Sequence, residues 1–233
     1  MERLSLLQKV LPACTASAEA YDDDTAYPLF PEEASAVARS AEGRRREFTT
    51  GRGCARRALS GLGLPPTPVP KDEQRAPAWP AGVIGSITHC VGFRAAAVAR
   101  ADDLAVLGID AEPHLPLPAR VGKEIAVDAE RARLTVLRRE APRICWDTVL
   151  FSAKESVYKA WFPLTRAWLG FQDAEVDLRA DGTFAVRVSP AVTEAGPSGF
   201  AGRWLVGRGL VVTSVTSARW PARSRPGSAP PRY

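Results

Sequence analysis

The chain is organised around one segment, Phe151-Ser152-Ala153-Lys154-Glu155-Ser156-Val157-Tyr158-Lys159-Ala160-Trp161. This segment holds two of the five lysines in a sequence with 31 basic residues, so arginine is the preferred cation elsewhere. Lysine offers a compact ammonium with three donors, and its use here indicates a need for that group. At helical spacing, Phe151, Glu155 and Tyr158 share one face, which directs a carboxylate inward beside aromatic rings.

The position of Glu155 allows two interpretations. A glutamate on the inward face of a helix needs a cation, because burial of an unpaired charge is costly. Lys159 follows four residues later and could form an ordinary surface pair with it. Alternatively, Glu155 is a metal ligand or a general base, and Lys159 binds a phosphate. The residues alone leave both interpretations open.

A second segment, Leu107-Gly108-Ile109-Asp110-Ala111-Glu112, has the apolar character of a buried strand. Residues two apart on a strand project to the same face, so Asp110 and Glu112 present their carboxylates side by side. Two such oxygen ligands, completed by water and substrate phosphates, are the usual environment of Mg²⁺. An isolated pair of this kind is more often an ordinary acidic strand end, so the motif is weak by itself.

Two further segments carry candidate anion-binding groups. Small residues in Gly85–Cys90 allow close approach of a ligand, while Ser86 and His89 supply donors, although a lone histidine is more often structural. Arg44 and Arg52 lie on one face of a predicted helix, about 12 Å apart along its axis. They could bind two phosphates of one ligand or form a solvated face.

The order of predicted elements favours an α+β fold. Helices are expected at about 44–62, 123–140 and 143–162, with Pro163 ending the last of them. Strands are expected at 82–90, 93–100 and 104–110, joined as a meander, and at 174–179, 183–189, 203–206 and 210–217. Helices followed by strands occur twice, which predicts two similar halves related by a pseudo-twofold axis. Each half would pack helices on an antiparallel sheet, with a ligand cleft between them. The predicted boundaries are 1–110 and 111–220, with 221–233 a disordered tail.

Composition narrows the possible partners. The 233 residues are 45% hydrophobic with a net charge of +5, which suits a folded protein with an anionic partner. No aromatic residues interleave with the basic clusters, so a nucleic-acid partner is not expected. Four widely spaced cysteines indicate free thiols of a reducing compartment, and no apolar run is long enough to cross a membrane. We therefore expect a cytoplasmic protein without a membrane partner.

Together these segments resemble the Sfp-type 4′-phosphopantetheinyl transferases, and within them the actinobacterial enzymes of polyketide, nonribosomal-peptide and lipid synthesis. The resemblance runs from Leu29-Phe30-Pro31-Glu32-Glu33 to about Ser217. It rests on residues 44–48, 52–56, 79–82, 85–90, 108–112, 151–165 and 168–171. It implies an enzyme that transfers 4′-phosphopantetheine from coenzyme A to a serine of apo acyl or peptidyl carrier proteins, with Mg²⁺ or Mn²⁺, releasing 3′,5′-ADP. A monomer is expected.

The resemblance also implies roles for individual residues. The implied metal ligands are Asp110, Glu112 and Glu155. The implied coenzyme A contacts are Arg44, Arg52, Lys71, Ser86 and His89. Lys154 and Lys159 would face the pyrophosphate, and Tyr158 and Trp168 would line the pantetheine channel. Glu155, directly or through a water molecule, would be the base for the serine hydroxyl, with Lys159 as its catalytic partner.

Three alternatives remain at this point. The nearest is a holo-synthase dedicated to the fatty-acid carrier protein, although such enzymes are typically about half as long. A coenzyme A-binding protein without chemistry would explain the arginines, and a nucleic-acid-binding module would explain the basic charge. Neither of these two requires Asp110, Glu112 and Glu155 together.

Overall fold

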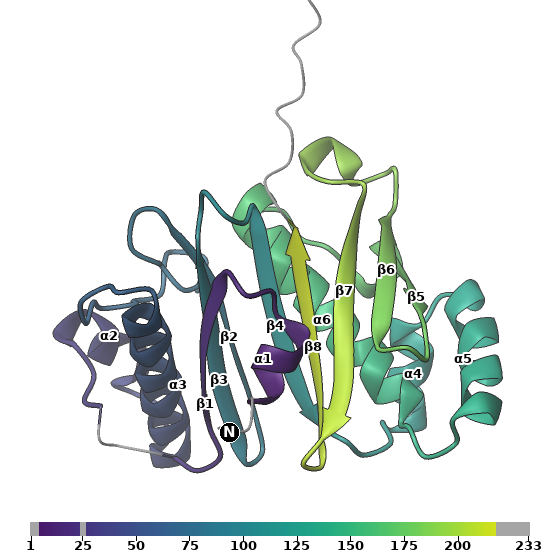
Figure 1. Cartoon of the computed structure of the whole chain (residues 1–233), viewed down its shortest axis with the longest axis horizontal. Helices are drawn as coiled ribbons and strands as arrows, with labels where there is room; N and C mark the ends of the chain where they lie inside the picture. Colours follow the sequence, from purple (N-terminus) through teal and green to yellow (C-terminus); the bar gives the residue numbers. More distant parts are fainter. Residues whose placement is uncertain (1–4, 24–26, 218–233) are drawn as a thin grey trace, which may run out of the picture.

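Two antiparallel sheets stand side by side in the computed structural model, which describes residues 5–23 and 27–217 (Figure 1). The strands are β1 (Thr15–Ala20), β2 (Val83–Cys90), β3 (Phe93–Arg100), β4 (Val106–Pro113), β5 (Ala174–Leu178), β6 (Thr183–Val188), β7 (Gly199–Gly207) and β8 (Leu210–Ser217). One sheet has the order β1-β3-β2 and the other β4-β8-β7-β6-β5. The predicted α+β class is confirmed, and the expected tail at 221–233 lies outside the described residues.

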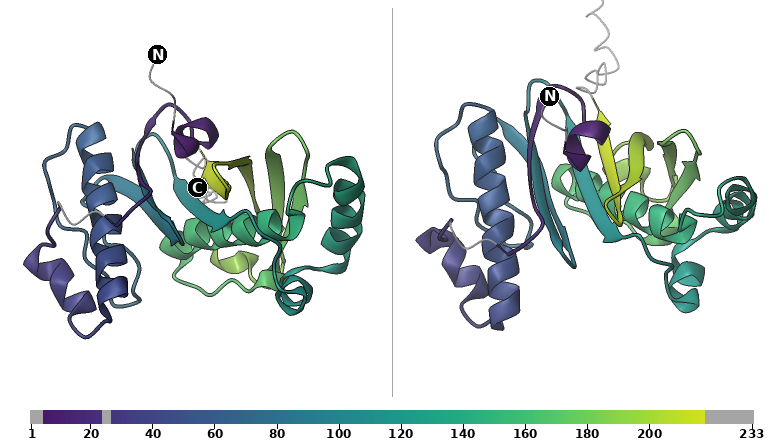
Figure 2. Two further views of the ribbon diagram at one scale, coloured as in Figure 1. Left: turned by 90° about the horizontal axis from the view of Figure 1, so that it is seen from below. Right: turned by 60° about the horizontal axis from the view of Figure 1, so that its bottom comes forward.

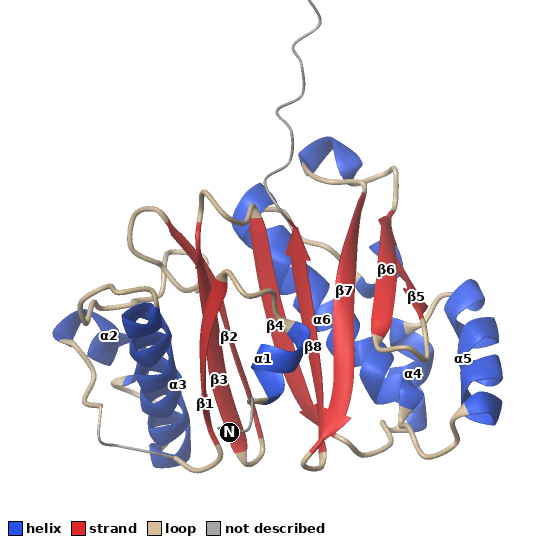
Figure 3. Ribbon diagram, in the orientation of Figure 1, coloured by secondary structure: helices blue, strands red, loops and turns tan. Residues whose placement is uncertain are grey.

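Helices cover both sheets (Figures 2 and 3). They are α1 (Leu6–Val10), α2 (Pro31–Ala34), α3 (Glu42–Gly61), α4 (Ala119–Ile125), α5 (Asp128–Glu140) and α6 (Trp146–Thr165), with 3-10 turns at Ser35–Val37, Phe171–Asp173 and Thr193–Ala195. Helix α3 packs on β1 and β3, whereas α6 packs on β4 and β8. The short α1 inserts Leu6, Leu7 and Val10 into a core shared by β3, β4 and β8, so it joins the two sheets.

Helix α6 is long because its apolar positions form a broad buried face. Trp146, Leu150, Val157 and Trp161 are almost completely buried in the core of the five-stranded sheet. The expectation that Pro163 ends the helix was wrong, because α6 continues to Thr165. A proline removes only one backbone donor, and the next turn is still closed by the Arg166 N–H, which donates to the Phe162 carbonyl at 2.9 Å.

The predicted meander of three strands was also wrong, because β4 pairs with β8 and not with β3. The N–H groups of Ile109 and Ala111 on β4 instead donate to the hydroxyls of Ser86 and Thr88 on β2, each at 3.1 Å. Side-chain oxygens therefore replace backbone carbonyls where the two sheets meet. Asp110 lies inside β4, so a division of the chain at residue 110 would cut this strand.

Gly108 sets the distance between β4 and α6. A Cβ atom at this position would lie 2.1 Å from the Ser156 carbonyl oxygen and 2.8 Å from the Ala160 nitrogen, both in the backbone of α6. No side chain fits into this space, so glycine is required for the close approach of the two backbones. The approach brings Asp110, two residues further along β4, beside the face of α6 that carries Lys159.

A buried glutamate anchors the first half. Glu33, the third residue of α2, is completely buried and accepts hydrogen bonds from the N–H groups of Phe30 at 3.0 Å and Val69 at 2.8 Å. Its carboxylate also pairs with Arg56 of α3 at 2.8 Å. These partners satisfy the charge, as a buried carboxylate requires.

The second half repeats this arrangement. Glu130, the third residue of α5, accepts from the N–H groups of Val127 at 2.8 Å and Val176 at 2.7 Å. It pairs with a cation of the long helix, Lys154 of α6, at 2.9 Å. The recurrence supports the predicted pseudo-twofold relation of the two halves, which stays a prediction.

Two expectations concern the environment of the protein. In the part of the chain that the structure covers, no helix combines the length and apolar character that a membrane crossing requires. All four cysteines lie in this part, and none of them is in a disulfide bond. The predicted cytoplasmic location is not tested by these observations.

Candidate active site

Asp110 and Lys159 form the centre of the candidate site. The Lys159 ammonium donates to Asp110 Oδ1 at 2.7 Å and to Thr88 Oγ1 at 3.3 Å. The Thr88 hydroxyl in turn donates to Asp110 Oδ1 at 3.2 Å. The second oxygen of Asp110, Oδ2, is buried without a hydrogen-bond partner among the described residues. A buried carboxylate oxygen is expected to have a partner, so Oδ2 is available to a ligand.

Two further carboxylates share the field of this centre. Burial raises the pKa of Glu112 to about 7, and the charge of Asp110 contributes to the shift. Burial also raises the pKa of Glu155, again with a contribution from Asp110, whereas Lys159 opposes both shifts. Three acids therefore share one ammonium, which leaves negative charge for a further cation to neutralise.

The excess of carboxylates over cations at this centre favours a bound metal ion. Within residues 5–23 and 27–217, no three acidic, histidine or cysteine side chains are arranged closely enough to hold a metal ion. The donor set is nevertheless of the right chemistry, since oxygen ligands with an unpartnered Asp110 Oδ2 among them suit a hard divalent cation. The chemistry of these oxygen donors suits Mg²⁺, and the metal site itself stays a prediction.

A cationic wall (Arg44, Arg52, Lys71, Arg75 and His89) borders this centre. The imidazole of His89 contacts Glu47 Oε1 through Nδ1 at 2.8 Å and the Arg44 guanidinium through Nε2 at 3.1 Å. Arg44 also forms an ion pair with Glu47. Burial lowers the pKa of His89, with Glu47 opposing, so a neutral imidazole that donates to Glu47 and accepts from Arg44 suits both contacts.

Two other members of the wall meet at the ring of Phe48. The Arg52 guanidinium carbon lies 4.2 Å from the ring centroid, and the Lys71 ammonium lies 5.1 Å from it. Arg52 is only 5% exposed, and burial lowers its pKa to about 10. Its Nε is a buried donor for which the described residues offer no acceptor. A buried guanidinium with an unpaired donor favours an anionic ligand.

Arg75 was not predicted from the sequence. Burial lowers the pKa of Lys71, and the charges of Arg44, Arg75 and Arg52 lower it further, which places all four cations within each other's field. Arg75 is exposed in a turn rich in polar residues. Only its sequence proximity to Lys71 could have indicated that it belongs to the cationic wall.

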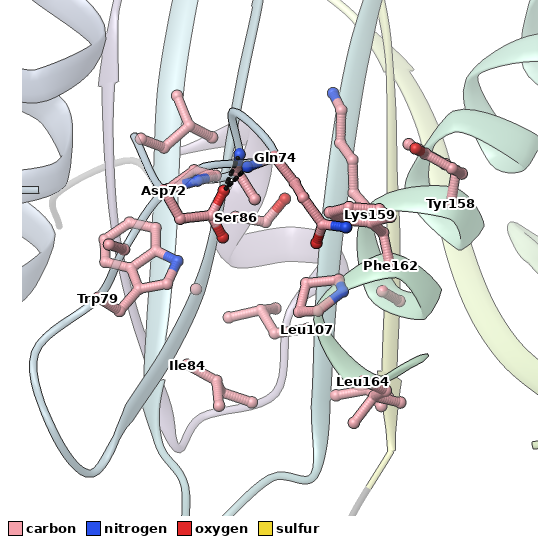
Figure 4. A pocket seen from close by; sticks show the side chains of 18 of the residues that line it. Asp72, Gln74, Trp79, Ile84, Ser86, Leu107, Tyr158, Lys159, Phe162 and Leu164 are labelled. Carbon is pink, nitrogen blue, oxygen red and sulfur yellow. Dashed lines mark hydrogen bonds between the residues drawn. The ribbon is translucent and has the colours of Figure 1, made fainter. Parts of the chain in front are cut away.

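A cavity of about 570 Å³ lies between the turn that contains Asp72, strands β2 and β4, and helix α6. Ser86, Tyr158 and Lys159, all predicted as site residues, line it (Figure 4). Ser86 is buried, and its hydroxyl already accepts the Ile109 N–H. Apolar side chains such as Leu107 and the polar side chains of Asp72, Gln74, Arg75 and Arg166 also line the cavity. Segments far apart in the sequence therefore meet at one hollow.

The two aromatic residues predicted for the pantetheine channel also come together. The rings of Tyr158 and Trp168 lie 5.2 Å apart between centroids. With Glu155 and Phe171 they line a second hollow of about 180 Å³. Trp168 is 74% exposed, an unusual environment for a large apolar ring, so this side of the molecule offers an aromatic surface next to Glu155.

The prediction that Lys154 faces a pyrophosphate was wrong. Its ammonium pairs with Glu130 at 2.9 Å and donates to the carbonyl oxygens of Ile125 and Phe171. An ammonium has three donors, and these contacts use all of them in the interior of the second half. Lys154 and Lys159 therefore serve different sides of α6. Lys154 lines the hollow beside Tyr158 and Trp168 with its donors already used, and Lys159 reaches the carboxylate centre.

Comparisons with known proteins place the chain in a family. The family model of the 4′-phosphopantetheinyl transferase N-terminal domain matches residues 32–99, and that of the 4′-phosphopantetheinyl transferase superfamily matches residues 106–206. The chain is 49% identical over 220 residues to the 4′-phosphopantetheinyl transferase Svp of Streptomyces mobaraensis, covering 91% of this chain and 89% of the relative.

Two other relatives match at nearly full length. The 4′-phosphopantetheinyl transferase PptT of Mycobacterium tuberculosis is 46% identical, over 91% of this chain and 97% of its own length. The 4′-phosphopantetheinyl transferase Npt of Nocardia iowensis is 41% identical, over 91% of this chain and its whole length. From these matches and from the site described above, the chain belongs to the 4′-phosphopantetheinyl transferase superfamily.

Proposed function

We propose that this protein transfers 4′-phosphopantetheine from coenzyme A to a serine hydroxyl of apo acyl or peptidyl carrier proteins and releases 3′,5′-ADP. One observation carries the proposal: the cationic wall and the carboxylate centre adjoin along β2. Thr88 contacts Asp110 at 3.2 Å, and the next residue, His89, contacts Arg44 at 3.1 Å. Anionic phosphates and a metal-assisted phosphoryl transfer need these two environments side by side.

The bonds made and broken define the task. The serine oxygen forms a bond to the phosphorus that bears pantetheine, and the bond from that phosphorus to the bridging oxygen of the pyrophosphate breaks. The hydroxyl proton passes to Glu155, directly or through a water molecule, and 3′,5′-ADP leaves. Because the phosphate oxygens repel the nucleophile, the protein must neutralise charge and position both partners.

The residues divide this work between them. Arg44 and Arg52, with Lys71 nearby, bind coenzyme A phosphates through charge-assisted hydrogen bonds, and His89, once protonated, donates from Nε2 to the same phosphates. Asp110, Glu112 and Glu155 would hold Mg²⁺, which supplies neutralisation of the pyrophosphate charge. Lys159, now 2.7 Å from Asp110, presents its ammonium to the pyrophosphate, and the neighbouring rings of Tyr158 and Trp168 hold the pantetheine arm.

Incubation with coenzyme A and a panel of apo carrier proteins, read by intact mass, tests the proposal. We expect several carriers to gain the mass of one phosphopantetheine group, with 3′,5′-ADP formed in equal amount. Modification of a fatty-acid carrier alone would instead indicate a dedicated holo-synthase. Coenzyme A binding without any modified carrier would contradict an enzymatic function.

The Glu155→Gln variant should separate a base from a metal ligand. Glutamine has nearly the same shape and keeps an oxygen for the metal, but it cannot accept the proton. We expect coenzyme A binding to persist while the transfer rate falls at least about a hundredfold. Steady-state rates at saturating Mg²⁺ measure this, with Glu175→Gln on β5 as the control. A rate within a few-fold of wild type, or rescue by more Mg²⁺, would leave Glu155 as a ligand alone.

The cationic wall predicts an effect on cofactor affinity. Arg52→Ala should weaken coenzyme A binding by about 1.5–3 kcal/mol, because a charge-assisted contact is lost, and His89→Ala should weaken it as well. Isothermal calorimetry gives these affinities directly. The matched control is Arg46→Ala, which removes an exposed arginine of the same helix. Wild-type affinity in both test variants would show that these residues are structural.

A further inference from the structure

The turn formed by residues 70–78 forms one rim of the 570 Å³ cavity beside β2, β4 and α6. Its ends are joined by the Ala78 N–H, which donates to the Pro70 carbonyl at 2.9 Å, and by the Asp72 N–H, which donates to the Ala76 carbonyl at 2.8 Å. The Asp72 carboxylate organises the interior of the turn (Figure 4). Its Oδ1 accepts from the N–H groups of Gln74 at 3.0 Å and Ala76 at 2.8 Å.

The same carboxylate reaches the other half of the molecule. Asp72 Oδ2 forms an ion pair with the guanidinium of Arg166, which directly follows α6. The side chains are 22% and 53% exposed, so the pair is screened by water and contributes little to global stability. Since the Asp72–Arg166 pair adds little stability, we looked to the cavity for its role.

The backbone at both sides of this pair is strained. Among the described residues, the non-glycine residues with positive φ are Arg75 at 70°, Arg166 at 55° and Arg208 at 54°, and the first two border the cavity. A residue that follows a helix in the left-handed conformation is most often glycine, because a side chain makes this conformation costly. Arginine at position 166 therefore indicates a use for its guanidinium.

The turn carries cations that belong to the candidate site. Lys71 directly precedes Asp72, and its ammonium lies 5.1 Å from the centroid of the Phe48 ring, which it shares with Arg52. Arg75 lies inside the turn and contributes to the positive field at Lys71. A shift of the turn would move both cations away from Arg44 and Arg52 on α3.

We propose that Asp72 is a positioning residue that, through Arg166, ties the turn with Lys71 and Arg75 to the end of α6. Coenzyme A would then meet the cations of the turn and the carboxylate centre of α6 as one preformed surface. The inference rests on the proposed function for the identity of the ligand. Preformation lowers the cost of ordering the site on binding, so it acts on affinity for coenzyme A rather than on the chemical step.

Two variants break the Asp72–Arg166 ion pair and preserve the local backbone conformation at the substituted position. Asp72→Asn keeps an oxygen acceptor for the turn, and Arg166→Gly keeps the left-handed conformation at lower strain. We expect each to raise the Kd and KM for coenzyme A roughly threefold to fivefold, as for an exposed ion pair, with kcat and the carrier KM unchanged. The double variant should be no weaker than either single variant, and Arg166→Lys should restore most of the affinity.

Thermal unfolding separates positioning from stability. Arg166→Gly should unfold at the same temperature as wild type or higher, so a loss of affinity in this variant cannot come from a weakened fold. Arg187→Ala, which breaks an exposed pair with Glu175 in the second sheet, is the control and should bind coenzyme A normally.

Two results would overturn the inference: wild-type affinity in both single variants, or losses that multiply in the double variant. Because calorimetry measures coenzyme A binding without a carrier, it tests the inference even if no carrier is modified. Absence of transfer by the wild-type protein would contradict the proposed function instead.

Discussion

Asp110→Ala is expected to abolish phosphopantetheine transfer. The substitution removes a carboxylate whose Oδ2 is free for a metal and whose Oδ1 holds the Lys159 ammonium at 2.7 Å. Without it, the pyrophosphate charge is not neutralised, and Lys159 loses the partner that positions it. Transfer measured by carrier mass at saturating Mg²⁺ gives the effect, and chelation of divalent ions should have the same consequence in the wild-type protein.

The control for this loss is a carboxylate outside the site. Asp177→Ala on the edge strand β5 removes a half-exposed carboxylate that pairs with Arg133 of α5 and with Arg179, and it should transfer normally. Circular dichroism must show that Asp110→Ala is folded. Near-normal turnover in the folded variant would remove Asp110, and with it the metal site, from the mechanism.

The second large effect concerns stability. Lys154→Met should lower the free energy of unfolding by about 3–5 kcal/mol, because it leaves Glu130 buried without its cation. The side chains of this pair are only 1% exposed, so water cannot replace the lost partner. Urea denaturation at neutral pH measures the change.

A double variant shows where the loss comes from. Glu130→Gln combined with Lys154→Met keeps an oxygen for the Val127 and Val176 N–H groups but removes the buried charge, so it should regain most of the stability. Both variants should bind coenzyme A like the wild type when folded. Unaltered stability of Lys154→Met together with weakened coenzyme A binding would return Lys154 to the active site.

The residues of the site could be predicted from the sequence, but their pairings could not. Asp110, Glu155 and Lys159 were all identified, yet the expected partner of Lys159 was Glu155 or a phosphate, whereas the structure pairs it with Asp110. The pairing depends on how far α6 is shifted along β4, which Gly108 permits but no local pattern encodes. For Lys154 the sequence did hold a signal that it points away from the site. Lys154 and Lys159 are five residues apart, so their side chains lie about 140° apart around the helix axis.

The positions of the helices and strands were largely predictable, because apolar periodicity and turn residues mark them. The partner of β4 was not, because β3 and β8 are both apolar and either could have paired with it. In the structure, the hydroxyls of Ser86 and Thr88 accept N–H groups at one edge of β4, and β8 pairs with its other edge. Such a side-chain substitution for backbone pairing has no sequence signature.

The two buried glutamates bear on the ancestry of the molecule. Each is the third residue of its helix and accepts from one amide three residues earlier and from one amide of a distant segment, but the cation is Arg56 for Glu33 and Lys154 for Glu130. This recurrence is what duplication of one ancestral unit predicts, since the acceptor is the same in both places and only the cation differs. If that prediction holds, one ancestral unit alone would have lacked either the cations around α3 or the carboxylates of β4 and α6, and only a pair of units could have assembled both.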